Sequence, residues 1–278
     1  MRVNRRRFLT LAGAGAAGGV GLYTWRIEPH RLEIVRRPLP IRALPPALAG
    51  RTLVQISDIH VGVRVADDYV LTTFRRVAEL RPDIVVMTGD FISHHAGSLD
   101  QVRAIYPRFP KGRLATVAVL GNHDYGPAWS HPEIAQPIVD LLLSLGITVL
   151  RNDVREVEGL QIAGLDDLWA DQFRPDQPLR RLDLRRAALV LSHNPDTVDL
   201  PVWEGYEGWI LSGHTHGGQC KPPFLPPPLL PVRNRRYTAG EFALDGNRRL
   251  YISRGVGHLL QVRFNVRPEV TAFELRPA

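Results

Sequence analysis

The sequence predicts a single α/β domain in which two sheets lie face to face with helices outside them. Three observations predict this fold. The first half of the chain alternates short apolar runs with amphipathic segments, as strands and helices of α/β proteins do. The second half contains mostly short strands. The 278 residues, 44% of them hydrophobic, are sufficient for one sizeable core.

The first half is expected to place helices between buried strands. Residues 27–50 are rich in Pro and Arg and are expected to form an extended lead-in. Apolar residues recur at helical spacing over 67–80 and 132–145, and Gly146 is expected to end the second of these helices. Strands are predicted at residues 53–56, 84–87 and 116–120.

From Ile147 onwards the pattern changes to a series of short strands. Asp245-Gly246-Asn247, between two of them, predicts a hairpin turn. The series favours a second sheet packed on the first. In this part of the chain, strands are predicted at residues 148–150, 154–157, 160–165, 187–192, 209–212, 240–244, 250–253 and 270–274.

The positive charge of the chain is concentrated at its N-terminus. The formal net charge is +7, but residues 1–26 contain five arginines and no acid. The rest of the chain holds 30 positive and 28 negative charges, so we expect no specific nucleic-acid partner. The single cysteine, Cys220, excludes an intramolecular disulfide framework and a Cys-rich zinc module.

The N-terminal segment 1–26 has the composition of an export signal. Arg5-Arg6-Arg7-Phe8-Leu9 precedes an uncharged, Ala- and Gly-rich stretch that reaches Trp25. The order Arg-Arg-x-Phe-Leu resembles the twin-arginine motif, which implies the twin-arginine export machinery as a partner and a periplasmic or other extracytoplasmic location. The glycines of the stretch predict a poor helix in water. Residues 8–25 are at the short end for spanning a bilayer, so cleavage and retention as a membrane anchor both remain open.

Five predicted strands run directly into polar motifs. Because ligands bind at the carboxyl ends of strands in open α/β sheets, these motifs are expected to converge on one rim. Gly89, Gly121 and Gly213 are expected to let the backbone turn sharply there. The motifs are Ser57-Asp58-Ile59-His60, Gly89-Asp90, Gly121-Asn122-His123-Asp124, Ser192-His193-Asn194 and Gly213-His214-Thr215-His216.

Each motif is a weak signal alone, but their joint occurrence at strand ends is specific. Their order resembles that of the calcineurin-like metallophosphoesterases over residues 51–276, and we assign the domain to 51–278. The resemblance implies a four-layer αββα sandwich with a two-metal site. It implies that Asp58, His60 and His216 hold one ion, that Asn122, His193 and His214 hold the second, and that Asp90 bridges them.

The resemblance also implies the metals and the reaction. Mixed imidazole and carboxylate ligands suit two divalent ions of Mn, Fe, Zn or Ni, whereas Ca and Mg prefer oxygen ligands. Two such ions with a bridging hydroxide can cleave a phosphoester by in-line displacement. By resemblance, His123 faces the leaving-group oxygen as general acid or stabilises charge there, and Asp124 orients it through the other ring nitrogen.

The substrate is less specified by the sequence. The motif 213–219, with the proline-rich run 222–231 after it, resembles the YkuE/YaeI-type branch, some relatives of which resemble UDP-diacylglucosamine pyrophosphate hydrolases. This predicts cleavage of a phosphodiester or pyrophosphate, with a lipid-linked substrate such as UDP-diacylglucosamine at a membrane surface as one candidate. A phosphomonoesterase or nuclease of the same mechanism, and a non-catalytic metal-binding surface protein, remain alternatives. Candidate substrate-binding residues are Phe224, Arg233 and Arg235.

One departure from the family pattern concerns the residues after Asp90. Many relatives carry a further Asp or Asn there, whereas this chain has Phe91-Ile92-Ser93-His94-His95. His94 and His95 either touch substrate or lie on the surface, and we favour the surface.

Overall fold

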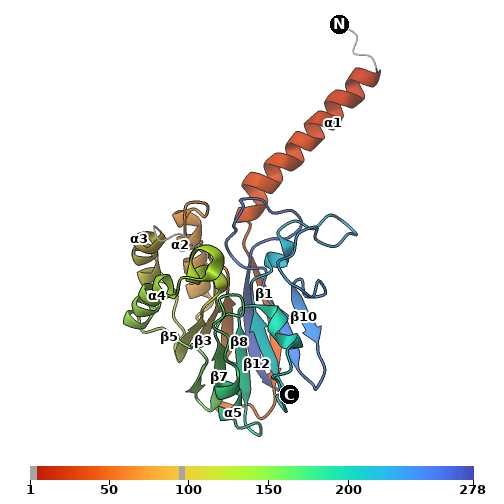
Figure 1. Cartoon of the computed structure of the whole chain (residues 1–278). Coiled ribbons are helices and arrows are strands. Elements are labelled where there is room, and N and C mark those ends of the chain that lie inside the picture. The colour runs from red at the N-terminus through yellow and green to blue at the C-terminus, as the bar shows by residue number, and fades with distance from the viewer. Residues whose placement is uncertain (1–4, 94–97) are drawn as a thin grey trace.

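Two mixed six-stranded sheets form the body of the protein, of which the computed structural model describes residues 5–93 and 98–278 (Figure 1). In the first sheet, β2 to β5 are parallel, and β12 runs antiparallel to β2. Its order is β1 (Glu33–Ile41), β12 (Glu269–Pro277), β2 (Thr52–Ile56), β3 (Ile84–Thr88), β4 (Ala115–Val119) and β5 (Thr148–Val149). The second sheet has the order β10 (Gly240–Ala243), β11 (Arg249–Ile252), β9 (Trp209–Ser212), β8 (Ala188–Ser192), β7 (Leu160–Leu165) and β6 (Asp153–Val157).

Three buried apolar layers separate four layers of structure. Alternate residues of β2 point to opposite faces, so that Leu53 packs between the sheets while Val54 packs under the helices. Leu189 of β8 lies with Leu53 in the layer between the sheets, and Val190 faces outward into the third layer. The predicted four-layer sandwich, built as a single domain, is therefore confirmed.

Helices cover the two outer faces unequally. The first sheet is covered by α2 (Asp67–Glu79), α3 (Ser98–Ile105) and α4 (Pro132–Ser144), as Figure 1 shows. The second sheet is covered by the short α5 (Asp176–Arg181) and by aromatic side chains from loops, among them Trp203 and Tyr237. The sequence did not predict α3 and α5, because helices of eight and six residues are too short to show a clear apolar period.

The segment 27–50 is extended, but it also contributes a strand to the sheet. Strand β1 pairs in parallel with β12 along nine residues. It lies at the edge of the first sheet, which accommodates Pro38 and Pro40 because an edge strand leaves one row of backbone groups unpaired. The sheet therefore includes residues before position 51. The predicted hairpin at 245–247 is present, since β10 and β11 pair antiparallel.

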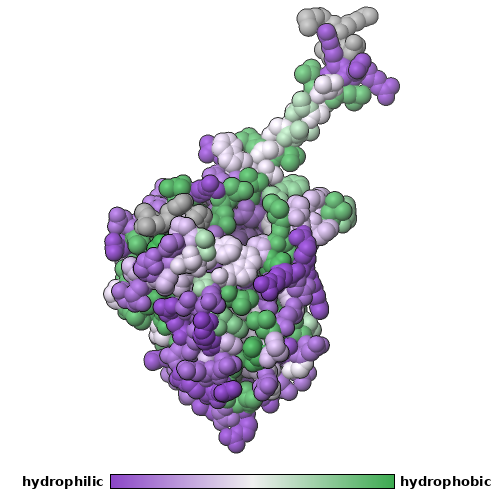
Figure 2. Space-filling view, in the orientation of Figure 1, coloured by the Kyte–Doolittle hydropathy of each residue, from purple (hydrophilic) through white to green (hydrophobic). Residues whose placement is uncertain are grey.

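Helix α1 (Arg5–Leu22) stands away from the body (Figure 1). The segment is helical although its glycines predict a poor helix. Figure 2 shows a mostly apolar or neutral surface along it and hydrophilic residues near its free end. Within the described residues, no helix has the length and apolar character needed to cross a membrane. The base of the helix is tied to the body, because Arg263 donates its N–H to the Thr24 carbonyl and Val266 donates to the buried Glu28 carboxylate.

Candidate metal centre

The polar motifs of five strand ends meet at one rim of the sandwich. Strands β2, β3 and β4 are parallel neighbours in the first sheet, and β8 and β9 are parallel neighbours in the second. Their carboxyl ends therefore carry the motifs to a common site, as predicted from the sequence. Each of the seven residues there is at most 5% exposed: Asp58, His60, Asp90, Asn122, His193, His214 and His216.

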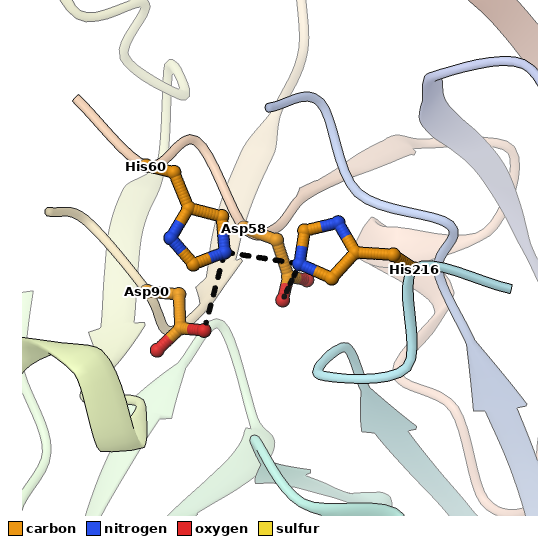
Figure 3. A group of neighbouring side chains, drawn as sticks. All are labelled: Asp58, His60, Asp90 and His216. Carbon is orange, nitrogen blue, oxygen red and sulfur yellow. Dashed lines mark hydrogen bonds and ion pairs between the residues drawn. The ribbon is translucent and has the colours of Figure 1, made fainter. Parts of the chain in front are cut away.

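Four of these side chains form a first cluster (Asp58, His60, Asp90 and His216), drawn in Figure 3. The Nε2 atoms of His60 and His216 face each other at 2.9 Å. The His60 Nε2 lies 3.4 Å from Asp90 Oδ2, and the His216 Nε2 lies 3.4 Å from Asp58 Oδ1. Nitrogen and oxygen lone pairs from three strand ends thus converge on one point.

A second cluster consists of Asp90, His193 and His214, with Asn122 beside them. The His193 Nε2 lies 3.3 Å from Asp90 Oδ2 and 3.2 Å from His214 Nδ1. The Asn122 Oδ1 lies 2.9 Å from His214 Nδ1 and 3.1 Å from His193 Nε2. The Asn122 Nδ2 is buried and has no hydrogen-bond partner among the described residues, so the amide is held by its oxygen end.

The spacing of these atoms fits transition-metal ions. Two ligand atoms that each lie about 2.1 Å from one ion, at the angles of tetrahedral or octahedral coordination, are roughly 3.0–3.4 Å apart. The distances in both clusters, 2.9 to 3.4 Å, match this requirement. Because Asp90 belongs to both clusters, the arrangement fits a pair of divalent ions with a shared carboxylate.

Backbone carbonyls orient the imidazole rings toward the clusters. The Nδ1 atoms of His60 and His193 lie 3.3 Å from the Ile92 carbonyl and 2.6 Å from the Thr88 carbonyl. A carbonyl only accepts, so Nδ1 carries the proton and Nε2 presents its lone pair to the cluster. His214 instead presents Nδ1, and its ring is hydrogen-bonded to the backbone of Pro231.

The backbone is strained where it carries the ligands. Five of the seven residues have φ between 50° and 71°, in the left-handed region that costs a non-glycine residue on the order of 1 kcal/mol or more. Such strain persists only where the surrounding contacts hold it, and it concentrates at functional sites. The five are Asp58, His60, Asp90, His214 and His216.

Two of the predicted turn glycines are needed for space. A Cβ at Gly213 would lie 2.3 Å from Asp58 Oδ2, and one at Gly121 would lie 2.2 Å from Asp90 Oδ1. Only Gly89 of the three has a positive φ, of 89°. Gly121 and Gly213 are therefore needed to leave room for the carboxylates, and not to allow a sharp turn of the backbone.

Burial sets the charge of the ligands. It lowers the pKa of His60 and of His214 to about 3 each, which keeps both rings neutral and able to bind a cation. Burial also raises the pKa of Asp58 to about 7. Burial opposes protonation of His193, but the Asp90 carboxylate raises its pKa well above the ordinary value. A cation bound at each cluster would displace the protons that the raised pKa values leave on Asp58 and His193.

The residues predicted to act beside the metals lie at the same rim. The His123 ring is half-buried, with its centroid 5.0 Å from that of His60, and its backbone N–H donates to Asp90 Oδ1. Asp124 accepts from four backbone N–H groups, those of Asp90, Phe91, Ile92 and Gly121. It thereby braces the loop after β3 against the loop after β4. That Asp124 also orients the His123 ring stays a prediction.

The three substrate-binding candidates lie in different surroundings. Arg233 borders a hollow lined by tryptophans, whereas Arg235 donates to the Pro227 and Pro228 carbonyls of its own loop. The Phe224 side chain is fully exposed. The proline-rich loop is partly packed, because Leu230 is buried while Leu225 and Leu229 are exposed. His94 and His95 lie outside the described residues.

Two buried charged residues next to the clusters were missed from the sequence. Arg263 is fully buried, and its Nη2 lies 3.4 Å from His216 Nδ1 and 2.6 Å from the Gly257 carbonyl. Asp167 is buried, and its charge adds to the larger effect of Asp90, which raises the pKa of His193 against the effect of burial. Asp167 follows the predicted strand 160–165, so the strand-end pattern could have identified it. Nothing in the local sequence distinguishes Arg263 from a surface arginine.

Comparisons with known proteins agree with this geometry. The model of the calcineurin-like phosphoesterase family matches residues 51–218, a range that contains all seven side chains. The chain is similar to the uncharacterised metallophosphoesterase YkuE of Bacillus subtilis, at 32% identity over 99% of this chain and 98% of YkuE. It is also similar to phosphodiesterase YaeI of Escherichia coli, at 33% identity over 98% of this chain and 99% of YaeI.

A third relative is more distant. The UDP-2,3-diacylglucosamine pyrophosphatase LpxG of Chlamydia trachomatis is 26% identical, over 91% of this chain and 93% of LpxG. The family predicted from the motifs is thus confirmed. The chain belongs to the calcineurin-like phosphoesterase family and is a metal-dependent hydrolase of phosphoester bonds.

Proposed function

We propose that the protein hydrolyses a phosphodiester or pyrophosphate bond at a dinuclear metal centre. One observation carries the proposal: two clusters of ligand atoms, each spaced for one transition-metal ion, share the Asp90 carboxylate. When bound, the two ions supply charge neutralisation at the phosphoryl group and activation of a water molecule.

We assign each cluster to one ion. Asp58, His60 and His216 hold the first, and Asn122, His193 and His214 hold the second, while Asp90 contacts both. The distances of 2.9 to 3.4 Å between ligand atoms support this assignment.

We assign His123 to the leaving group. Its ring lies beside the first cluster and is only half-buried, so it can reach a substrate that approaches from solvent. There the imidazole donates a proton to the departing oxygen or stabilises its charge. The four hydrogen bonds to Asp124 support this role indirectly, because they fix the loop that carries His123.

A lipid-linked substrate at a membrane surface is the class that we favour. The similarity to the UDP-2,3-diacylglucosamine pyrophosphatase LpxG supports it. The exposed Phe224, Leu225 and Leu229 also support it, because they lie on the loop that follows His216 and can contact acyl chains.

A substrate panel tests the proposal. The Mn-supplemented protein is assayed with bis(p-nitrophenyl) phosphate, p-nitrophenyl phosphate and DNA, and then with a lipid extract whose turnover is followed by mass spectrometry. We expect hydrolysis of the diester and of a lipid species, both abolished by EDTA. Faster hydrolysis of the monoester or DNA would favour the alternative esterases, and an inactive protein that binds two ions would favour a non-catalytic role.

We also propose that residues 1–26 direct export by a twin-arginine-like route, which places the enzyme outside the cytoplasm, free or anchored to the membrane. The Arg5-Arg6-Arg7-Phe8-Leu9 order supports this. A fusion of residues 1–40 to a folded reporter is expected to leave the cytoplasm, and replacing Arg5 and Arg6 by Lys is expected to retain it. A cytosolic wild-type fusion would refute the proposal.

A further inference from the structure

An open hollow lies at the rim of the sandwich that carries the metal ligands. It has a volume of about 470 Å³, within the range of small-molecule sites. Four loops that follow strand ends meet around it. Its lining residues are Trp129, Leu168, Trp169, Leu200 and Arg233.

The two tryptophans connect the hollow to the catalytic groups. The Trp169 ring packs edge-on against the His214 ring, with 4.4 Å between their centroids. The Trp129 ring lies 6.4 Å from the His123 ring and 4.7 Å from the Trp169 ring. A substituent on a phosphoryl group held near His214 and His123 therefore has this hollow beside it.

Backbone contacts hold the lining residues in place. The Asp167 Oδ1 accepts the N–H of Trp169 at 2.7 Å, and the Asp196 carboxylate accepts the N–H of Arg233 at 2.7 Å. Trp129 has a φ of 58°, a left-handed conformation that its N–H bond to the Gly126 carbonyl helps to maintain. Such an arrangement presents rigid aromatic faces rather than a loosely packed loop.

We propose that this hollow is a substrate subsite for a flat aromatic ring attached to the reacting phosphoryl group. Tryptophan faces stack on flat rings. Arg233 borders the same space and is exposed, and its guanidinium has no ion pair or hydrogen bond within the described part of the chain. A planar guanidinium binds carboxylates and phosphates well, so Arg233 receives an anionic group carried by the ring substituent.

The charge at the edge of the hollow favours a ring with an anionic group over an acyl chain. An acyl chain offers the Arg233 guanidinium no partner, whereas an anionic group can pair with it. The subsite rests on the proposed function, since it places the ring by reference to a phosphoryl group at the metal centre.

Phosphonates that cannot be hydrolysed test the subsite. Competitive inhibition constants are measured on the Mn-loaded enzyme for methylphosphonate, phenylphosphonate and 4-carboxyphenylphosphonate. We expect phenylphosphonate to bind at least about 10-fold more tightly than methylphosphonate, in line with base–aromatic stacking. We expect Trp129→Ala to reduce this ratio to below about 3-fold and Trp129→Phe to keep most of it.

The carboxylate of 4-carboxyphenylphosphonate tests the role of Arg233. We expect the additional gain of 4-carboxyphenylphosphonate over phenylphosphonate to disappear in Arg233→Ala. Arg267→Ala serves as the matched control, because Arg267 is also exposed and lies on a different hollow. Equal loss in both variants would refute a specific role for Arg233.

The outcomes of these measurements distinguish failure of the subsite proposal from failure of the proposed function. Inhibition by methylphosphonate without any advantage for the ring would overturn the subsite and leave the phosphoesterase assignment standing. Failure of all three phosphonates to bind, together with no diester hydrolysis, would count against the proposed function itself. Metal content is measured for every variant, so that loss of an ion is not mistaken for loss of the subsite.

Discussion

The two halves of the metal centre each hold two histidines and share Asp90, but they differ in their remaining ligand and in the charge beside them. The first cluster is bordered by the Arg263 guanidinium, 3.4 Å from His216 Nδ1, which lowers the pKa of that ring together with burial and His60. The second is bordered by the buried Asp167. Burial lowers the pKa of His193, whereas the Asp90 carboxylate raises it above the ordinary value, with smaller contributions from Asp58 and Asp167.

This difference predicts unequal affinity for ions. A fixed positive charge weakens cation binding nearby, and a fixed negative charge strengthens it, most of all where water is excluded. We therefore expect the second ion, at His193 and His214, to bind more tightly than the first. Ligand identity alone would have favoured the first ion, because the first cluster contains the Asp58 carboxylate where the second contains the neutral Asn122 amide, but the Arg263 guanidinium offsets the Asp58 charge.

The largest effect on metal content and turnover is expected for Asp90, the residue that both clusters share. Asp90→Ala removes a ligand atom from both clusters, so we expect loss of both ions and a fall in turnover of at least about 10³-fold. Elemental analysis of the purified variant measures the ions. Asp100→Ala, at an exposed aspartate, is the control. Two retained ions in Asp90→Ala would disprove the shared role.

His123→Ala is expected to separate catalysis from metal binding. Turnover should fall by roughly 10²–10⁴-fold because the leaving group loses its proton donor, while metal content stays at the wild-type value. Steady-state kinetics and elemental analysis of the same preparation check both. Normal turnover would dismiss His123 as the acid.

Asp167→Asn tests the asymmetry directly. The amide oxygen can still accept the Trp169 and Ala170 N–H groups, so the variant removes charge and keeps the loop. We expect the tighter of two Mn²⁺ binding steps to weaken by roughly 10–100-fold, as for other residues behind metal ligands. Calorimetric titration measures both steps. If only the weaker Mn²⁺ binding step were affected, the second cluster would be the weaker site, and our assignment of the tighter step to it would be wrong.

The smallest effect concerns the surroundings of the first cluster. Burial lowers the pKa of His258 to about 4, below its ordinary value of 6.5, so the unfolded chain binds a proton more readily between these values. The free energy of unfolding should therefore fall as the pH drops from 6.5 to 4, by up to roughly 2–3 kcal/mol from this residue. His258→Gln should reduce that dependence.

The pH dependence of the free energy of unfolding is measured by urea unfolding in EDTA at pH 7.5 and 5. Chelation by EDTA removes any contribution from bound ions. His131→Gln is the control, because His131 is exposed. An unchanged pH dependence in His258→Gln would show that His258 does not titrate as described.

Local patterns were enough to predict the sandwich and the polar rim. A buried strand is apolar and ends where polar residues begin, so Ile84–Thr88 followed by Asp90, and Trp209–Ser212 followed by His214, are visible without tertiary information. Parallel strands then bring such ends together, which is why residues 156 positions apart, His60 and His216, could be expected to meet.

What only the tertiary structure decided depends on contacts between distant segments. An arginine at position 263 has the same local pattern whether it is exposed or buried behind His216, and Trp129 could equally have packed in the core. The pairing of β1 with β12 joins segments more than 200 residues apart. Sequence periodicity reports which face of an element is buried but not which distant partner covers it, so the Arg263 charge and the aromatic rings beside the metal centre emerged only from the fold.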